Sequence, residues 1–202
     1  MLYRHLAYFV LVCTLTLTQW VCAAPTPGEL NVSGALSLQT RYFPNEALYE
    51  EQPNTDVSLS GELEAIYKLD DGRTSFNFNV LGRHDSKNPV REHVELREAF
   101  FRHRGDNYEI RLGQRRVFWG VTESQHLVDI INQTDIQEDF DGDPKLGQLM
   151  ANLAWIGGYG TLEGFVMPVF REQRYGSIAD QKRSRLRAPY PVDDSQPVYS
   201  VP

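Results

Sequence analysis

Two groups of charged residues are the part of this chain best suited to act on a solute. The first comprises six arginines between residues 83 and 116: Arg83, Arg97, Arg102, Arg111, Arg115 and Arg116. The second is a run of acids between Gly120 and Gln148: Glu123, Asp129, Asp135, Glu138, Asp139, Asp141 and Asp143. If the acidic segment folded against a wall that carried the arginines, the opposed charges would set up a transverse field. Such a field orients and filters polar solutes, as rings of charged side chains do in channels. A solvated external loop with ordinary arginines at a rim is the alternative interpretation.

Other chemistry is not expected from these residues. Asp139, Asp141 and Asp143 alternate as the acids of a calcium loop do, but Pro144 replaces the usual glycine and Met150 stands at the position of the bidentate glutamate. A loosely bound calcium at the three aspartates is therefore only a weak alternative. The histidines lack the spacing of a metal site, and no GxSxG motif accompanies the neighbouring serine and histidine of the acidic segment. We predict no enzyme, no cofactor and no metal.

Holding the arginines on one surface requires strands, and the alternation of apolar and polar residues predicts them. Seven segments alternate between apolar and polar residues with a period of two. In the first, Leu30, Val32, Leu36 and Leu38 alternate with small or polar residues. Successive side chains of a strand point to opposite faces, so each segment has one apolar and one polar side. The segments are residues 30–41, 57–69, 76–80, 93–103, 108–112, 149–155 and 161–170.

The fourth segment changes phase part-way along. Its apolar residues Val94 and Leu96 lie at even positions, whereas Ala99 and Phe101 lie at odd positions. A β-bulge near Arg97–Glu98 would add one residue to the strand and return all four side chains to one face. An error in the assigned register explains the change equally well.

The connections between these segments alternate between short and long. Residues 70–73, 105–107 and 157–160 are tight-turn sequences, and residues 43–55, 84–92 and 120–148 are longer connections. In an up-and-down antiparallel sheet this alternation places every short turn at one end and every long loop at the other. Outer-membrane barrels have that layout. We therefore predict an all-β fold, an antiparallel up-and-down transmembrane β-barrel with about seven strands present.

The two ends of the chain differ from this middle part. A basic start at Arg4, the apolar stretch Leu6–Leu17 and the small residues before Ala24 predict a Sec-type signal peptide over residues 1–23. A retained membrane anchor and a lipid on Cys22 are weaker alternatives. The partial barrel is expected over residues 24–170, and the charged, proline-bearing residues 171–202 are expected to be a loop or a disordered tail. Because bacterial barrels have an even number of strands, we expect the chain to be a fragment of a longer barrel, with a complete small protein as the alternative.

Composition narrows the classes of partner. The net charge of −7 argues against nucleic acid, whose binding proteins carry a concentrated basic patch. Both cysteines, Cys13 and Cys22, lie within the predicted signal peptide, so the exported part would be held together without disulfides.

One stretch resembles a known family. The element Glu98-Ala99-Phe100-Phe101, followed through a turn by the stretch from Arg111 to Gly120 with its Leu112-Gly113-Gln114 and Trp119-Gly120 residues, is similar to a recurrent stretch of large Gram-negative outer-membrane porin-like proteins. The resemblance is specific over residues 96–120 and extends only by strand pattern over residues 29–170. It implies a barrel with a polar lumen for passive uptake or export. The odd strand count departs from the family.

These observations lead to one function and two alternatives. We predict part of a porin-like channel in the outer membrane of a Gram-negative bacterium, exported by a cleaved signal peptide. Small polar solutes would diffuse passively through its arginine-lined lumen, past the acidic loop. The expected partners are outer-membrane lipid and these solutes, with no nucleic acid, and the sequence leaves open whether copies form a homo-oligomer. A secreted or periplasmic β-rich binding module and a non-conducting barrel scaffold are the alternatives.

Overall fold

The computed structural model describes residues 13–22, 28–47, 49–118, 130–136, 138 and 144–172, and of residues 13–22 the backbone alone. These residues form one antiparallel sheet of eight strands. The strands are β1 (Cys13–Cys22), β2 (Glu29–Tyr42), β3 (Thr55–Lys68), β4 (Thr74–Asp85), β5 (His93–Arg104), β6 (Tyr108–Arg115), β7 (Gln148–Gly157) and β8 (Gly160–Val166). A single 3-10 turn, η1 (Pro89–Arg91), lies between β4 and β5. No helix among the described residues is long and apolar enough to cross a membrane.

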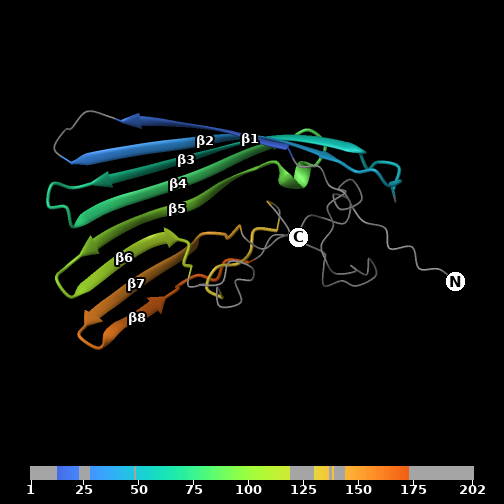
Figure 1. Ribbon diagram of the computed structural model, residues 1–202. Helices are drawn as coiled ribbons and strands as arrows, with labels where there is room; N and C mark the ends of the chain where they lie inside the picture. Colours follow the sequence, from blue (N-terminus) through green and yellow to red (C-terminus); the bar gives the residue numbers. More distant parts are fainter. Residues whose placement is uncertain are drawn as a thin grey trace.

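The strands lie in the sheet in chain order, and each pairs antiparallel with the next. This arrangement confirms the predicted all-β, up-and-down architecture. The sheet is open, with β1 and β8 at its two edges. Figure 1 shows the short turns together at one end of the curved sheet and the longer connections together at the other.

The seven segments predicted from the alternation correspond to β2–β8. Most of these strands are longer than predicted, because pairing with a neighbour carries the backbone beyond the cleanly alternating residues. For example, β4 continues to Asp85, whereas the clean alternation stops at Val80. The last strand is shorter than predicted: β8 ends at Val166 and not at Phe170. Pro168 follows two residues later and has no backbone N–H to donate to a ladder, so the strand cannot continue through it.

The sheet also contains a strand that the sequence analysis did not expect. β1 covers residues that we assigned to the signal peptide, and it pairs with β2 along its whole length. Leu17 lies opposite Leu36, and Leu15 lies opposite Leu38. The threonines between these leucines favour an extended backbone because they are β-branched. Cleavage after Ala23 stays a prediction.

The phase change of the fourth predicted segment is a β-bulge in β5. Asn79 of β4 pairs with Glu98, and the next residue, Val80, pairs with Leu96. Arg97 is therefore the extra residue, as the bulge hypothesis required, and the alternative of a misassigned register is wrong. The bulge keeps the apolar residues before and after it on one face of the sheet.

The turn between β3 and β4 illustrates how the local sequence closes the short connections. Asp71 Oδ1 accepts hydrogen bonds from the backbone N–H groups of Arg73 and Thr74, each at 2.8 Å, and Asp71 Oδ2 accepts one from the Thr74 hydroxyl at 2.7 Å. These bonds, first that of the Thr74 hydroxyl, hold the pKa of Asp71 below its ordinary value. Gly72 adopts a φ of 63°, which glycine accepts without a steric penalty.

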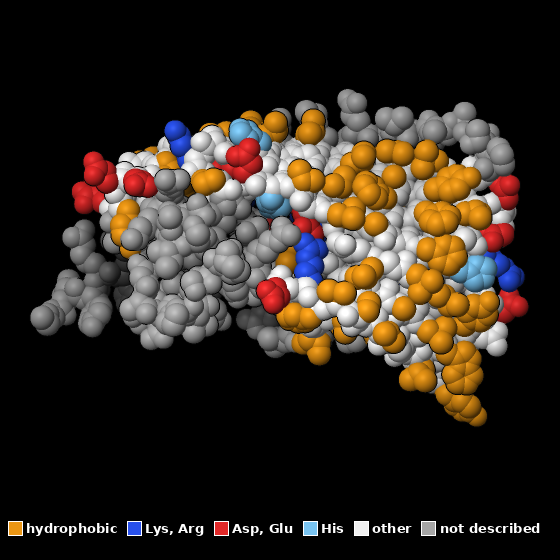
Figure 2. All heavy atoms as spheres, turned by 180° about the vertical axis from the view of Figure 1, so that it is seen from behind, with side chains coloured by type: hydrophobic (Ala, Val, Ile, Leu, Met, Phe, Trp, Pro, Cys, Tyr) orange, Lys and Arg blue, Asp and Glu red, His pale blue; other side chains and the backbone are white. Residues whose placement is uncertain are grey.

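The two faces of the sheet are inverted relative to a water-soluble protein. Large apolar side chains of β2–β8 are exposed, among them Leu36 (57% exposed), Phe76 (51%) and Leu153 (52%). On the other face Glu109 and Asn152 are almost fully buried, at 1% and 2% exposed. Among the described residues, nineteen polar or charged residues are buried, against five hydrophobic ones. We call the face with the exposed apolar side chains the apolar face, and the face with Glu109 and Asn152 the polar face. Figure 2 shows hydrophobic side chains gathered over the side of the sheet seen from behind.

Candidate functional site: the polar face and the segment that covers it

The polar face takes alternate residues from β2–β8, and register brings them into rows across the sheet. Ser60 lies opposite Arg83, and Asn79 lies opposite both Glu64 and Glu98 on its two neighbouring strands. Apolar partners form the matching rows on the other face, for instance Phe76 with Phe101, whose ring centroids are 5.5 Å apart. Sequence alternation therefore decides the face on which a residue lies, and register decides which residues it meets.

Part of the long connection between β6 and β7 lies against the polar face at the end of the sheet that carries the longer connections. We call residues 130–136, 138 and 144–147 the covering segment. Its two arms pair with each other through an isolated antiparallel bridge between Thr134 and Lys145. Leu146 N–H also donates to the Gln133 carbonyl at 2.8 Å, and Asp135 N–H donates to the Pro144 carbonyl at 2.7 Å.

Asn132 fastens the covering segment to the end of β6. Its side-chain oxygen accepts a hydrogen bond from Val117 N–H at 2.7 Å. Its amide nitrogen donates to the carbonyls of Arg115 and Leu146, at 3.0 and 2.8 Å. The residue is 3% exposed, so the three bonds satisfy polar groups that water does not reach.

Glu138 fastens the same segment to β4 through a buried ion pair. Arg83 Nε donates to Glu138 Oε2 at 2.8 Å, and Arg83 Nη2 donates to the other carboxylate oxygen, which makes the contact bidentate. Both side chains are about nine-tenths buried, at 7% and 10% exposed. Burial raises the pKa of Glu138, but the hydrogen bond and charge of Arg83, with the charges of Arg91 and Arg97, outweigh it and hold the pKa below its ordinary value.

Arg91 of η1 ties the covering segment to the sheet a second time. Its guanidinium donates to the Glu138 carbonyl at 3.1 Å, to Gln39 Oε1 at 3.1 Å and to Asp85 Oδ2 at 3.2 Å. Burial, together with the positive charges of Arg41 and Arg83, lowers the pKa of Arg91 to about 10, so the side chain is still charged at neutral pH.

Asp135 is the third contact between the covering segment and the sheet. Its Oδ2 lies 3.9 Å from His93 Nε2, while His93 Nδ1 lies 2.9 Å from the Arg91 carbonyl and donates to it. Burial raises the pKa of Asp135. The nearby His93 lowers it and the charge of Glu138 raises it further, and the balance leaves the pKa above its ordinary value.

Further ion pairs run along the polar face under and beside this segment. The bulge residue Arg97 lies 3.1 Å from Glu62, which also accepts a bond from Asn79 at 2.8 Å. Arg116 lies 3.7 Å from Glu98. Arg171, beyond the end of β8, reaches across to Glu95 of β5 at 2.6 Å.

A second group of arginines lies nearer the short-turn end. Arg102 of β5 is directly opposite Arg111 of β6. Arg111 forms ion pairs with Glu109 and with Glu163, the latter at 3.1 Å. Arg111 and Arg115 both donate to Asn152 Oδ1, at 2.8 and 3.0 Å.

Five of the six predicted wall arginines lie on β4–β6, and Arg116 follows directly after β6. Of the predicted acids, Asp135 lies beside His93, and Glu138 binds Arg83. Glu123, Asp129, Asp139, Asp141 and Asp143 lie outside the described residues, as does the weak calcium alternative at the last three. No group of three potential metal-ligating side chains occurs among the residues that the structure describes.

Three residues that hold the covering segment on the sheet were not predicted from the sequence. Arg91, His93 and Asn132 are prominent in the contacts of the covering segment, yet none of them belongs to a motif. Arg91 follows Asp85 by six residues within the connection between β4 and β5, and this opposite-charge spacing is the only local signal that we find for it. Nothing near Asn132 in the chain indicates its partners, because they belong to residues 115, 117 and 146.

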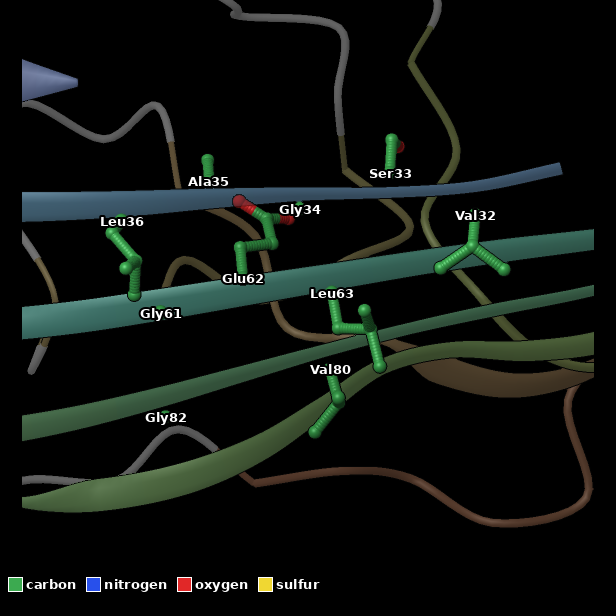
Figure 3. A pocket seen from close by; sticks show the side chains of 10 residues that line it. All are labelled: Val32, Ser33, Gly34, Ala35, Leu36, Gly61, Glu62, Leu63, Val80 and Gly82. Carbon is green, nitrogen blue, oxygen red and sulfur yellow. The ribbon is translucent and has the colours of Figure 1, made fainter. Parts of the chain in front are cut away.

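The apolar face has a hollow of its own over β2–β4. Gly34, Gly61 and Gly82 supply no side chains there, and Gly61 lies directly opposite Gly82. Figure 3 shows Val32, Leu63 and Val80 on one side of the strands, and Ser33, Ala35 and Glu62 on the other. The hollow therefore interrupts an otherwise continuous apolar surface.

No known family, curated protein or solved structure matches this chain.

Proposed function

We propose that this chain supplies strands of an outer-membrane β-barrel whose polar face lines a pore for small polar solutes. The observation that carries the proposal is the inverted sidedness of the sheet. Monomeric soluble proteins rarely expose a contiguous apolar patch of more than a few hundred Å². Here exposed apolar residues recur on every strand from β2 to β8, which suits a surface that faces lipid.

The placement of charge supports the same proposal. An arginine or lysine on the lipid face of a barrel costs ~2–4 kcal/mol at the bilayer midplane. The strand arginines Arg83, Arg102, Arg111 and Arg115 alternate with the exposed apolar residues and share the face of the buried Glu109 and Asn152. A polar face of this kind is stable when water fills the space that it surrounds.

Strand length is a second support. β2 and β3 each have 14 residues, and β4 and β5 each have 12. A tilted strand needs ~9–11 residues to cross the hydrocarbon core of a bilayer. The four strands are thus long enough to span it, with residues left over at the interfaces.

The open edges require that further strands take part. An unpaired N–H or C=O group in lipid costs several kcal/mol, so a sheet in a membrane must close on itself. β8 has a partner on one side only among the described residues. We propose that a signal peptide over residues 1–23, which includes β1, is cleaved on export, and that strands in addition to β2–β8 complete the barrel.

The covering segment suggests how the pore would be narrowed. It packs on the polar face through Asn132, Glu138 and Asp135, and so it would lie inside a closed barrel and not outside it. Glu138 of the segment then faces Arg83 of the wall, and Asp135 faces His93. This arrangement favours a constriction loop over a solvated external loop.

Cell fractionation with electrophoresis is the test. The gene would be expressed with its natural downstream DNA, and the outer-membrane fraction analysed with and without boiling, followed by conductance in planar bilayers. We expect an outer-membrane protein whose mobility shifts on boiling and which conducts. A boiling shift without conductance would replace the pore by the barrel scaffold. A periplasmic product with no shift would overturn the barrel and favour the β-rich binding module.

A further inference from the structure

We propose that Arg102, Arg111 and Arg115, the arginine cluster, form a binding site for the oxyanion group of a solute, a carboxylate or a phosphate. The inference goes beyond the proposed pore by naming the chemistry that its wall selects. It rests on the proposed function only for the route by which the solute arrives, because the site itself belongs to β5–β7.

Register creates a concentration of like charge at this point. Arg102 and Arg111 are direct cross-strand partners on the polar face. Two like charges in that position repel each other, and the pair is destabilising unless a counter-charge lies nearby. Arg115 adds a third guanidinium, held near Arg111 because both donate to Asn152 Oδ1.

The carboxylates of the wall do not balance these charges. Glu109 forms ion pairs with Arg104, at 2.8 Å, and with Arg111. Glu163 forms an ion pair with Arg111 at 3.1 Å. Among the described residues, no carboxylate lies within 4.0 Å of Arg102 or Arg115. The cluster and Arg104 together carry four positive charges against the two negative charges of these glutamates.

Two of the guanidinium groups also have unused donors. The Nε atoms of Arg102 and Arg115 are buried and have no hydrogen-bond partner in the part of the chain that the structure describes. An N–H donor in such a position needs an acceptor, and a guanidinium is best satisfied by a planar or tetrahedral oxyanion that accepts two bonds. The unsatisfied donors and the excess charge therefore point to the same ligand.

The rest of the polar face shows that this excess is local. Arg83, Arg91, Arg97, Arg116 and Arg171 each have a carboxylate partner, namely Glu138, Asp85, Glu62, Glu98 and Glu95. The Nε atoms of Arg91 and Arg116 are also buried without a hydrogen-bond partner, but the charge of each of these side chains is paired with a carboxylate. Arg102 and Arg115 combine an unpartnered Nε with an unpaired charge among the described residues. The site is also shaped in advance, since Asn152 orients two of its guanidinium groups and Arg115 lies over the Phe100 ring, 5.7 Å from its centroid.

The test compares ion currents through the full-length protein in planar bilayers. Inorganic phosphate and acetate are titrated against a chloride current for the wild type, for Arg102→Gln and for Arg115→Gln. We expect both oxyanions to reduce the wild-type chloride current, and each substitution to weaken this block about tenfold, as the loss of one charge-assisted hydrogen bond predicts. Arg102→Lys, which keeps the charge but not the planar fork, should retain the preference for anions and lose part of the block.

The control is Arg73→Gln, because Arg73 is an exposed turn residue paired with Asp106 and lies outside the cluster. A boiling shift shows that each variant has folded. A wild-type channel whose current neither oxyanion reduces, or a block that the two cluster variants leave unchanged, would overturn the site while the proposed pore stands. If the protein does not conduct, the pore fails, and phosphate binding to the detergent-solubilised protein decides the site separately. Binding that Arg102→Gln weakens about tenfold supports the site, and no binding, or binding that this substitution leaves unchanged, refutes it.

Discussion

The ion pair between Glu138 and Arg83 is the contact whose loss should have the clearest effect on the covering segment. Glu138→Gln removes the negative charge with almost no change in volume. Arg83 then remains buried, at 7% exposed, without its counter-charge. We expect the covering segment to dock less tightly while the strands beneath it stay paired.

The magnitude follows from the geometry. Removal of one partner from a buried ion pair costs ~3–5 kcal/mol. Here the glutamine carbonyl still accepts one bond from Arg83, and Ser58 Oγ still accepts another at 2.8 Å. Because these bonds persist, we expect a loss nearer ~2 kcal/mol, which is about a thirtyfold change in the equilibrium between docked and undocked segment.

Hydrogen exchange measures this equilibrium directly. Val117 N–H donates to Asn132 Oδ1, and Leu146 N–H donates to the Gln133 carbonyl, so both are protected only while the segment is docked and folded. In Glu138→Gln their exchange should be about thirtyfold faster, and the amides of β3 and β4 should be unchanged.

A matched control is available in the same part of the molecule. Glu92 pairs with His84 at 2.9 Å, but the two side chains are 53% and 73% exposed, so Glu92→Gln should leave exchange unchanged. Equal exchange of Val117 and Leu146 in Glu138→Gln and in the wild type would refute the argument that this ion pair holds the segment on the sheet.

Three further predictions concern the same structure. The stabilisation of docking by Glu138 should weaken as the pH falls below 4.5, the ordinary pKa of glutamate: the folded pKa of Glu138 is lowered, so its contribution is present above that value and disappears as the carboxylate is protonated. The raised pKa of Asp135 acts in the opposite direction, so the measurement is the ratio of Leu146 N–H exchange between the wild type and Glu138→Gln, which share Asp135. A ratio that does not change with pH would contradict the prediction. Asn132→Ala removes three buried hydrogen bonds and should destabilise docking by ~2–4 kcal/mol, measured by the exchange of Leu146 N–H. An effect under ~0.5 kcal/mol would show that Asn132 does not hold the covering segment on the sheet. Leu36→Arg places a charge at the middle of β2 on the apolar face and should cost ~2–4 kcal/mol of folding free energy in lipid vesicles. If urea titration finds this variant as stable as the wild type, the apolar face does not meet lipid.

The position of Gly113 shows how sequence and structure explain different aspects of one residue. It belongs to the Leu112-Gly113-Gln114 stretch on which the family resemblance depends, but the sequence alone offers no physical reason for a glycine within a strand. In the structure its φ is 129°, and a side chain there would collide with the Ala99 carbonyl oxygen of the neighbouring strand. The positive φ and the lack of space for a Cβ atom each disfavour any residue other than glycine at this position.

Strands β2–β8, the alternation of their short and long connections, and the face on which each of their residues lies follow from the sequence alone, whereas β1 does not. These properties are local: a period of two assigns Leu36 and Ser37 to opposite faces whatever their neighbours are, and Gly and Asp residues mark the turns. The phase change around Arg97 even located the bulge, because one extra residue must shift every side chain beyond it.

Which charges meet depends on the packing of the whole sheet and its covering segment. Arg83 and Glu138 are 55 positions apart in the chain, and Arg171 and Glu95 are 76 apart. Their contacts depend on the register of several strand pairs and on the path of the covering segment. Any of the acids between Gly120 and Gln148 could have matched any arginine of the wall by charge alone. Partner choice is a non-local property, set by packing, and for that reason the sequence predicted two facing groups of charge but not the pairs they form or the arginines left without a carboxylate.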